Sequence, residues 1–81
     1  MGEQQPAGLD DLSLQILELE GRRFKYQGAK ERAIRSELGI PVTAYYQRLN
    51  VLIDDADAWA LRPALLRRLR DQRDGASGAT A

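Results

Sequence analysis

Residues 29–53 read AKERAIRSELGIPVTAYYQRLNVLI, and this stretch determines the architecture that we expect. Its first part places apolar side chains at helical spacing and stops at Gly39, the residue that most readily takes the left-handed conformation closing a helix. Pro41 cannot continue that helix but fits the first turn of a new one. The stretch therefore predicts two short helices, over residues 29–38 and about 42–54, joined by a tight turn.

The second of these helices separates an apolar face from a polar one. Tyr45, Leu49 and Leu52 recur at helical spacing and should be buried. Two helices joined by so short a turn are the sequence form of a helix-turn-helix, in which the second helix anchors by one face and exposes the other. The residues expected on that other face are Thr43, Ala44, Gln47 and Arg48, with Val51 as a further candidate.

The segment before this unit also predicts a helix. Leu9 and Asp10 have the character of an apolar residue followed by a capping carboxylate, so the first helix should run from Asp10 to about Tyr26. Gly21 lies inside that pattern, where it should either bend the helix or admit a neighbouring backbone.

Three carboxylates crowd residues 54–57, between the third helix and the last. A calcium loop would need more oxygen ligands at set spacing and a glycine for its turn, and neither is present. We therefore interpret the segment as a polar loop with Asp57 as the cap of the residues that follow. Pro63 then opens a last helix that runs to about Asp71.

The expected fold class is all-α, a small helical bundle of about four helices around the central helix-turn-helix, because no strand-like alternation occurs in the chain. Residues 1–8 and 74–81 are mostly small or polar and should be disordered tails, which leaves residues 9–73 as the domain. The predicted core consists of Ile16, Leu19, Phe24, Ile34, Leu38, Tyr45, Leu49, Leu52 and Trp59, together with Leu61, Leu65, Leu66 and Leu69 of the last helix.

The composition excludes several classes of function. The 81 residues include no cysteine and no histidine, so disulfides and thiol catalysis are absent, and the commonest general base and metal ligand is missing. We therefore expect no enzyme, no cofactor and no metal site. The chain begins without the pattern of a signal peptide, and no apolar run approaches the roughly 20 residues that span a bilayer. A cytoplasmic protein without membrane contact is expected.

Seven short segments between Leu9 and Arg73 carry a likeness to a known family. These segments are Ile16-Leu17-Glu18-Leu19-Glu20, Gly28-Ala29-Lys30-Glu31, Ala33-Ile34-Arg35, Glu37-Leu38-Gly39-Ile40, Tyr45-Tyr46-Gln47-Arg48-Leu49-Asn50, Leu52-Ile53-Asp54-Asp55 and Leu65-Leu66-Arg67-Arg68-Leu69-Arg70. Together they resemble a family of small actinobacterial proteins of unknown function. The resemblance implies a helix-turn-helix-like fold in a cytoplasmic actinobacterial protein, and it implies no established activity.

Charge is unevenly distributed along the chain, although twelve Lys and Arg balance twelve Asp and Glu. Residues 9–20 carry four carboxylates and no cation, whereas residues 21–35 carry six cations against one carboxylate and residues 58–73 carry five against one. Cations beside a recognition helix supply the sequence-independent part of DNA affinity. The residues predicted to bind phosphate are Lys30, Arg32, Arg67 and Arg68.

These features predict a small protein that binds double-stranded DNA in transcription regulation. The predicted base-reading residues are Thr43, Ala44, Gln47 and Arg48. Gln suits adenine and Arg suits guanine, although Arg48 could instead pair with a carboxylate such as Asp55 or Glu37.

The alternative function is a protein-interaction module that docks on RNA polymerase, a sigma factor or another regulator. In that case Tyr46, Trp59 and the leucines of the last helix would be candidate anchors, and otherwise these side chains would be packed against the core. A homodimer through the last helix is compatible with either function.

Overall fold

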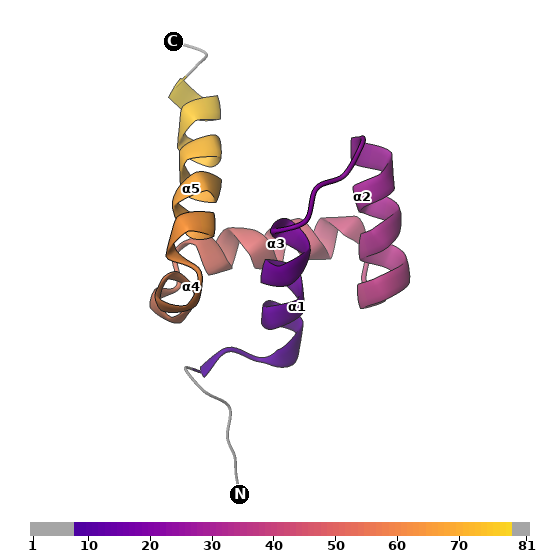
Figure 1. Cartoon of the computed structure of the whole chain (residues 1–81), viewed down its shortest axis with the longest axis horizontal. Helices are drawn as coiled ribbons and strands as arrows, with labels where there is room; N and C mark the ends of the chain where they lie inside the picture. Colours follow the sequence, from indigo (N-terminus) through magenta and orange to yellow (C-terminus); the bar gives the residue numbers. More distant parts are fainter. Residues whose placement is uncertain (1–7, 79–81) are drawn as a thin grey trace, which may run out of the picture.

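A computed structural model describes residues 8–78 of the chain, and the secondary structure within that range is helical. In order, the elements are α1 (Asp11–Glu20), α2 (Gln27–Ala33), a π-helical turn η2 (Ile34–Leu38), α3 (Val42–Ile53), α4 (Ala56–Leu61) and α5 (Pro63–Gly78) (Figure 1). The all-α class is confirmed, with no strand between residues 8 and 78.

Helix α3 is the centre of the arrangement. It runs across the middle of the molecule, α2 and α5 stand steeply to it at its two ends, and α1 lies across it (Figure 1). Contacts of α3 with α1, η2, α4 and α5 hold the bundle together. The aromatic ring of Tyr45, which is fully buried, lies at the centre of the core.

Helix α1 begins as predicted but ends early. The Asp10 side chain caps it by accepting a hydrogen bond from the Ser13 N–H, at 2.9 Å. The predicted continuation to Tyr26 is wrong, because the helix stops at Gly21 and residues 22–26 form a loop. The group that comes close to Gly21 is a side chain rather than a backbone: a terminal nitrogen of Arg62 lies 2.8 Å from the position that a Cβ would occupy.

The turn between the two central helices has the predicted chemistry. Gly39 is left-handed, with φ of +70°, and its N–H donates to the Arg35 carbonyl at 3.1 Å. The preceding helix begins at Gln27 rather than Ala29, and its last five residues adopt the wider π-helical turn. Pro41 then precedes the first residue of α3 in extended conformation.

The carboxylate-rich loop caps a separate helix, which raises the number of α-helices to five between residues 8 and 78. The predicted cap, Asp57, is wrong. The Asp55 carboxylate is the cap, accepting from the N–H of Asp57 at 2.7 Å and of Ala58 at 3.3 Å. Helix α5 continues to Gly78, beyond the predicted end at Asp71 and into the segment expected to be a tail. Residues 1–7 and 79–81 of the predicted tails lie outside the described residues.

The predicted core is largely confirmed. The predicted residues that are buried are Ile16, Leu19, Ile34, Tyr45, Leu49, Leu52, Leu65, Leu66 and Leu69. Phe24, Leu38 and Trp59 are only partly buried and pack against the edge of the core. The prediction that Leu61 is buried is wrong, because its side chain is 50% exposed. Leu61 is the last residue of α4, and the chain turns before Pro63, so Leu61 does not share the buried face of the α5 leucines.

Candidate functional site

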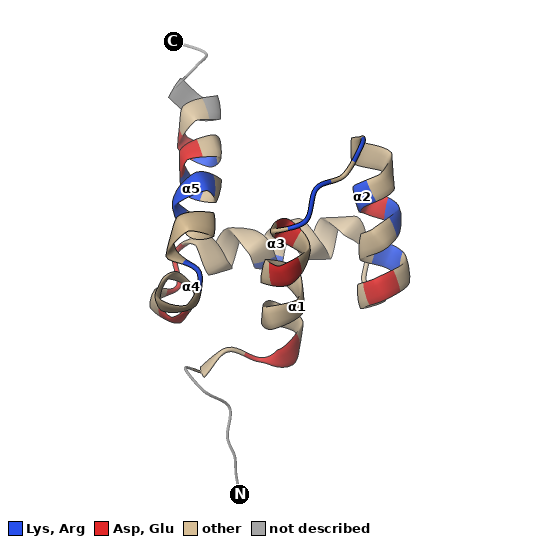
Figure 2. Cartoon of the chain, in the orientation of Figure 1, with Lys and Arg blue, Asp and Glu red and all other residues tan. Residues whose placement is uncertain are grey.

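Charge is unevenly distributed over the molecule (Figure 2). Lys and Arg follow the loop of residues 21–26, helix α2 and helix α5, where carboxylates are interspersed, and further carboxylates lie at both ends of α1 and before α4. The basic runs were visible in the sequence, and the fold brings four of their cations together at the carboxyl end of α1.

A cleft at the carboxyl end of α1 collects four cations from three elements. We name it the cationic cleft, with a volume of about 380 Å³. Its lining residues are Glu20, Gly21, Arg22, Arg23, Lys30, Arg68, Leu69 and Gln72.

The position of the cationic cleft follows from the end of α1. The carbonyls of the last turn of a helix have no partner within it, and this end carries partial negative charge. The last turn of α1 holds no basic residue of its own. Arg68 compensates from α5, because its Nη2 donates to the Glu20 carbonyl at 3.2 Å, and Arg62 reaches Gly21 from the start of α5.

Lys30 is engaged within the protein. Its Nζ lies 2.8 Å from Oε2 of Glu20, a carboxylate whose side chain is 5% exposed. The Tyr45 hydroxyl donates a hydrogen bond to the same oxygen. Burial of the ring, followed by its bond to Glu20, raises the pKa of Tyr45 well above its ordinary value. Lys30, which was predicted to bind phosphate, is thus the partner of a buried carboxylate in this structure.

Arg22 is also paired. Its two terminal nitrogens donate to the two carboxylate oxygens of Glu37 at 2.8 and 3.0 Å, which lowers the pKa of Glu37 and raises that of Arg22. The guanidinium also lies 5.2 Å from the centre of the Phe24 ring. Of the four cleft cations, Arg23 and Arg68 are the two without a carboxylate partner among residues 8–78.

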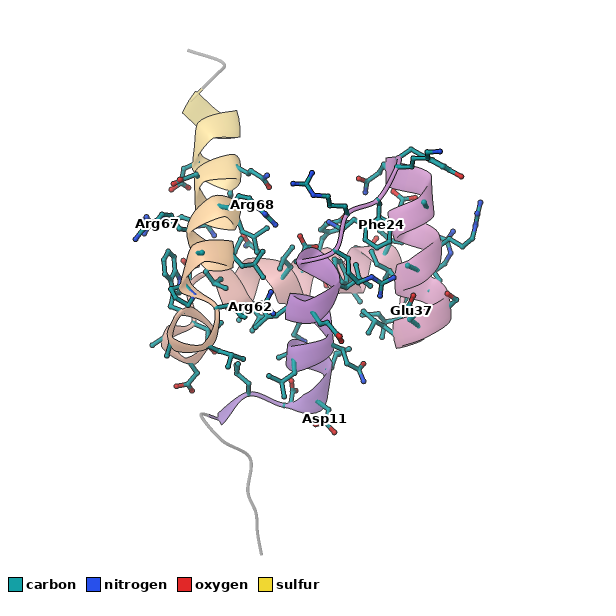
Figure 3. The ribbon with its side chains drawn as sticks, in the orientation of Figure 1. Asp11, Phe24, Glu37, Arg62, Arg67 and Arg68 are labelled. Carbon is teal, nitrogen blue, oxygen red and sulfur yellow. The ribbon has the colours of Figure 1, made fainter. Side chains whose placement is uncertain are left out.

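The two cations predicted on α5 point in different directions. Figure 3 shows Arg67 and Arg68 leaving the helix on different sides, with Arg68 directed towards the cationic cleft and Arg67 away from it. Arg32 on α2 is exposed, as predicted. Arg23 was counted in the basic run but not singled out, and only its place in the fold distinguishes it from its neighbours.

Arg48, predicted to read bases, lies at the opposite end of α1. Its Nη1 is 3.1 Å from Oδ2 of Asp10, so its partner is neither Asp55 nor Glu37. The pKa of Asp10 is lowered, chiefly by the hydrogen bond from Ser13 and to a smaller extent by Arg48. Helix α1 has ten residues and is therefore about 15 Å long, which separates Arg48 from the cationic cleft.

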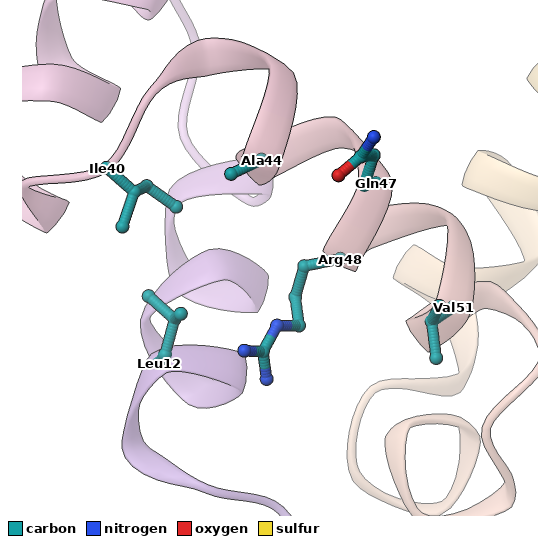
Figure 4. Close-up of a pocket in the computed structure, with 6 residues that line it drawn as sticks. All are labelled: Leu12, Ile40, Ala44, Gln47, Arg48 and Val51. Carbon is teal, nitrogen blue, oxygen red and sulfur yellow. The ribbon is translucent and has the colours of Figure 1, made fainter.

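An apolar groove of about 520 Å³ runs between α1 and α3 beside this ion pair (Figure 4). Its lining residues are Leu12, Ile40, Ala44, Gln47, Arg48 and Val51. Val51, which the helical pattern placed away from the buried face, is 64% exposed. Three of the predicted base-reading residues thus line an apolar groove, whereas Thr43 is exposed outside it.

The other flank of α3 adjoins the cationic cleft. The cleft shares Glu20, Leu69 and Gln72 with a second hollow, whose α3 residues include Tyr46 and Asn50. Asn50 was missed by sequence reasoning, although it lies seven residues after Thr43 and hence on the same side of the helix.

The two aromatic candidates for a protein interface are used within the structure. The Tyr46 hydroxyl accepts a hydrogen bond from Gln27 Nε2 at 2.9 Å. The Trp59 indole N–H donates to the Ile53 carbonyl at 2.6 Å, and the Arg70 guanidinium lies 4.8 Å from the centre of the indole. Both rings are half-buried against the core.

The helices between residues 8 and 78 lack the combination of length and apolar character that crossing a membrane requires. Over the same residues, no three carboxylates are grouped as ligands of a metal ion. Comparison with curated proteins found no match, and neither did comparison with solved structures. A family model described as "Protein of unknown function (DUF3263)" matches residues 8–79. The chain therefore belongs to the DUF3263 family.

Proposed function

We propose that the protein is a small helix-turn-helix protein that binds double-stranded DNA and acts in transcription regulation. The observation that carries the proposal is the cationic cleft, where Arg23 and Arg68 stand without a carboxylate partner among the described residues, next to an exposed flank of α3. The left-handed Gly39 turn between η2 and α3 supports the helix-turn-helix interpretation. The resemblance to small actinobacterial proteins implies the same helix-turn-helix-like fold.

The charge distribution indicates the side from which a duplex approaches. Phosphates are attracted to the side of the cationic cleft, and they are repelled from the start of α1, where Asp10 and Asp11 lie. DNA bound at the cleft would face Thr43 and Asn50 on α3, which lie seven residues apart on one side of the helix, with Gln47 between them at the edge of the apolar groove. Asn and Gln pair with adenine in the major groove. Arg48 could join them only by leaving Asp10.

A titration of ¹⁵N-labelled protein with a random-sequence duplex at low salt tests this proposal. We expect amide and side-chain shifts at Arg23, Arg68, Thr43 and Asn50 that weaken steeply as salt is added, because phosphate contacts release counterions. Shifts confined to the apolar groove, or no shifts at all, would contradict it.

A second candidate function is supported by the apolar groove. Val51 is the most exposed of the large apolar side chains among the described residues, and it lies beside Ala44 and Leu12 with two carboxylates, Asp10 and Asp11, at the start of α1. The occupant that fits is an amphipathic helix of a protein partner with a cation on its flank. Purified RNA polymerase is the probe: shifts at residues 44–51 that Val51→Asp abolishes would support this function.

A further inference from the structure

We propose that the cationic cleft is a binding site for one phosphoryl group, which Arg23 of the loop and Arg68 of α5 would contact. The inference deepens the proposed function, because a backbone phosphate of DNA is one source of such a group and free phosphate is the other. It also assigns the role of phosphate contact to a residue, Arg23, that the charge pattern alone did not distinguish.

The cationic cleft keeps an excess of positive charge despite containing a carboxylate. Glu20 is the one acidic residue in its lining, and Lys30 Nζ at 2.8 Å neutralises it. Arg22 is neutralised by Glu37. The charges of Arg23 and Arg68 therefore remain, and they exceed the partial negative charge of about one half that the end of α1 contributes.

The donors of the two arginines are also available. A guanidinium has five N–H donors in a planar fork that matches phosphate oxygens. Arg68 uses its Nη2 to donate to the Glu20 carbonyl, and no hydrogen bond of Arg23 to residues 8–78 is present. Several N–H groups are thus left to bind a phosphoryl group from two sides of the cationic cleft.

One of the two arginines is positioned before a ligand arrives. The bond to the Glu20 carbonyl orients the Arg68 side chain. Arg23 lies in a short loop that the pair of Arg22 with Glu37 ties to η2, while the Arg23 side chain itself is exposed. Groups that are already ordered lose less conformational entropy on binding, so the cationic cleft should bind phosphate more strongly than isolated surface arginines do.

The test compares Arg23→Ala with Arg67→Ala in the full chain. Arg67 is the matched control, because it is also an exposed arginine but points away from the cationic cleft. We titrate each protein with inorganic phosphate at constant ionic strength, using sodium chloride as the reference, and follow the arginine side-chain ¹⁵N resonances. We expect saturable shifts at Arg23 and Arg68, at least a fivefold loss of phosphate affinity in Arg23→Ala, and less than a twofold change in Arg67→Ala.

A second arm measures binding to a random-sequence duplex as salt is varied. Arg23→Ala should weaken this binding and reduce the slope of log affinity against log salt by about one. Arg68→Lys gives an independent check that keeps the charge but loses the fork, with circular dichroism to verify folding. It should lower phosphate affinity more than Arg67→Lys does.

The outcomes separate the two proposals. Saturable phosphate binding that requires Arg23, in a protein that does not bind the duplex, would support the phosphoryl-binding site. It would assign that site to free phosphate and contradict the DNA proposal. If wild type and Arg23→Ala bind the duplex with equal affinity, or if the shifts caused by phosphate match those caused by chloride, the phosphoryl-binding site is refuted and the DNA proposal still holds.

Discussion

Replacing Lys30 by Met tests the buried pair that joins α1, α2 and α3. The substitution keeps the apolar stem and removes the charge that lies 2.8 Å from the Glu20 carboxylate. Two unit charges at that distance attract by about 6 kcal/mol at an effective dielectric constant of about 20. The loss is smaller in practice, because Glu20 keeps the hydrogen bond from Tyr45 and because 19% of the Lys30 side chain already reaches water.

Removing one partner of a buried ion pair costs about 3–5 kcal/mol. We therefore expect Lys30→Met to lower the free energy of unfolding by about 3 kcal/mol, a large share of the roughly 4–11 kcal/mol typical of a 71-residue domain. The assay is urea denaturation followed by circular dichroism at 222 nm. The control is Lys25→Met, an exposed lysine of the adjacent loop, which should change the free energy of unfolding by less than about 0.5 kcal/mol.

The double variant Glu20→Gln/Lys30→Met isolates the cause. Neutralising Glu20 removes the unpaired charge, so the double variant should regain at least half of the stability that Lys30→Met loses. If Lys30→Met and Lys25→Met lower the free energy of unfolding by the same amount, or if the double variant is less stable than Lys30→Met, then the buried pair does not stabilise the fold.

Three further predictions concern the fold. Gly39→Val should lower the free energy of unfolding by about 1–3 kcal/mol through left-handed strain, and Gly39→Asn by less than half of that, in the same denaturation assay. Leu49→Ala should cost about 2–5 kcal/mol because it leaves a cavity, whereas Leu61→Ala, at a half-exposed site, should cost under about 0.5 kcal/mol; equal losses would contradict the assigned helical phase. Because the folded state raises the pKa of Tyr45 above its ordinary 10.0, the unfolded chain releases this proton first, so stability should fall by about 1.4 kcal/mol per pH unit above pH 10. Tyr45→Phe should lack that slope in alkaline denaturation curves.

The candidate site could be predicted only in outline from the sequence. The basic runs were visible, and they do lie along α2, the loop of residues 21–26 and α5. The sequence did not show which Lys and Arg side chains in these runs lack a carboxylate partner. The charge pattern singled out Lys30 and left Arg22 and Arg23 undistinguished, but Lys30 and Arg22 meet Glu20 and Glu37 across the fold.

The two faces of α3 show the same limit. Periodicity identified its buried face, because that face depends only on spacing along the helix. It could not show that one exposed flank borders an acidic helix start and an apolar groove, while the other borders the cationic cleft. That difference arises from the way α1 lies across α3, with Arg48 paired to Asp10 at one end and Arg68 bound to Glu20 at the other.

The sequence alone predicted those features that depend on interactions between residues close to one another along the chain. The left-handed turn at Gly39 and the cap at Asp10 each depend on atoms at most four residues away, so they are encoded locally. The groups that bind Glu20 are more distant in sequence: Lys30 and Tyr45 reach its carboxylate, and Arg68 reaches its backbone carbonyl from α5. Such contacts form only when the helices pack, because no local preference selects one carboxylate or one arginine among several of the same kind. The free cations, and with them the proposed site, are therefore a property of the tertiary structure.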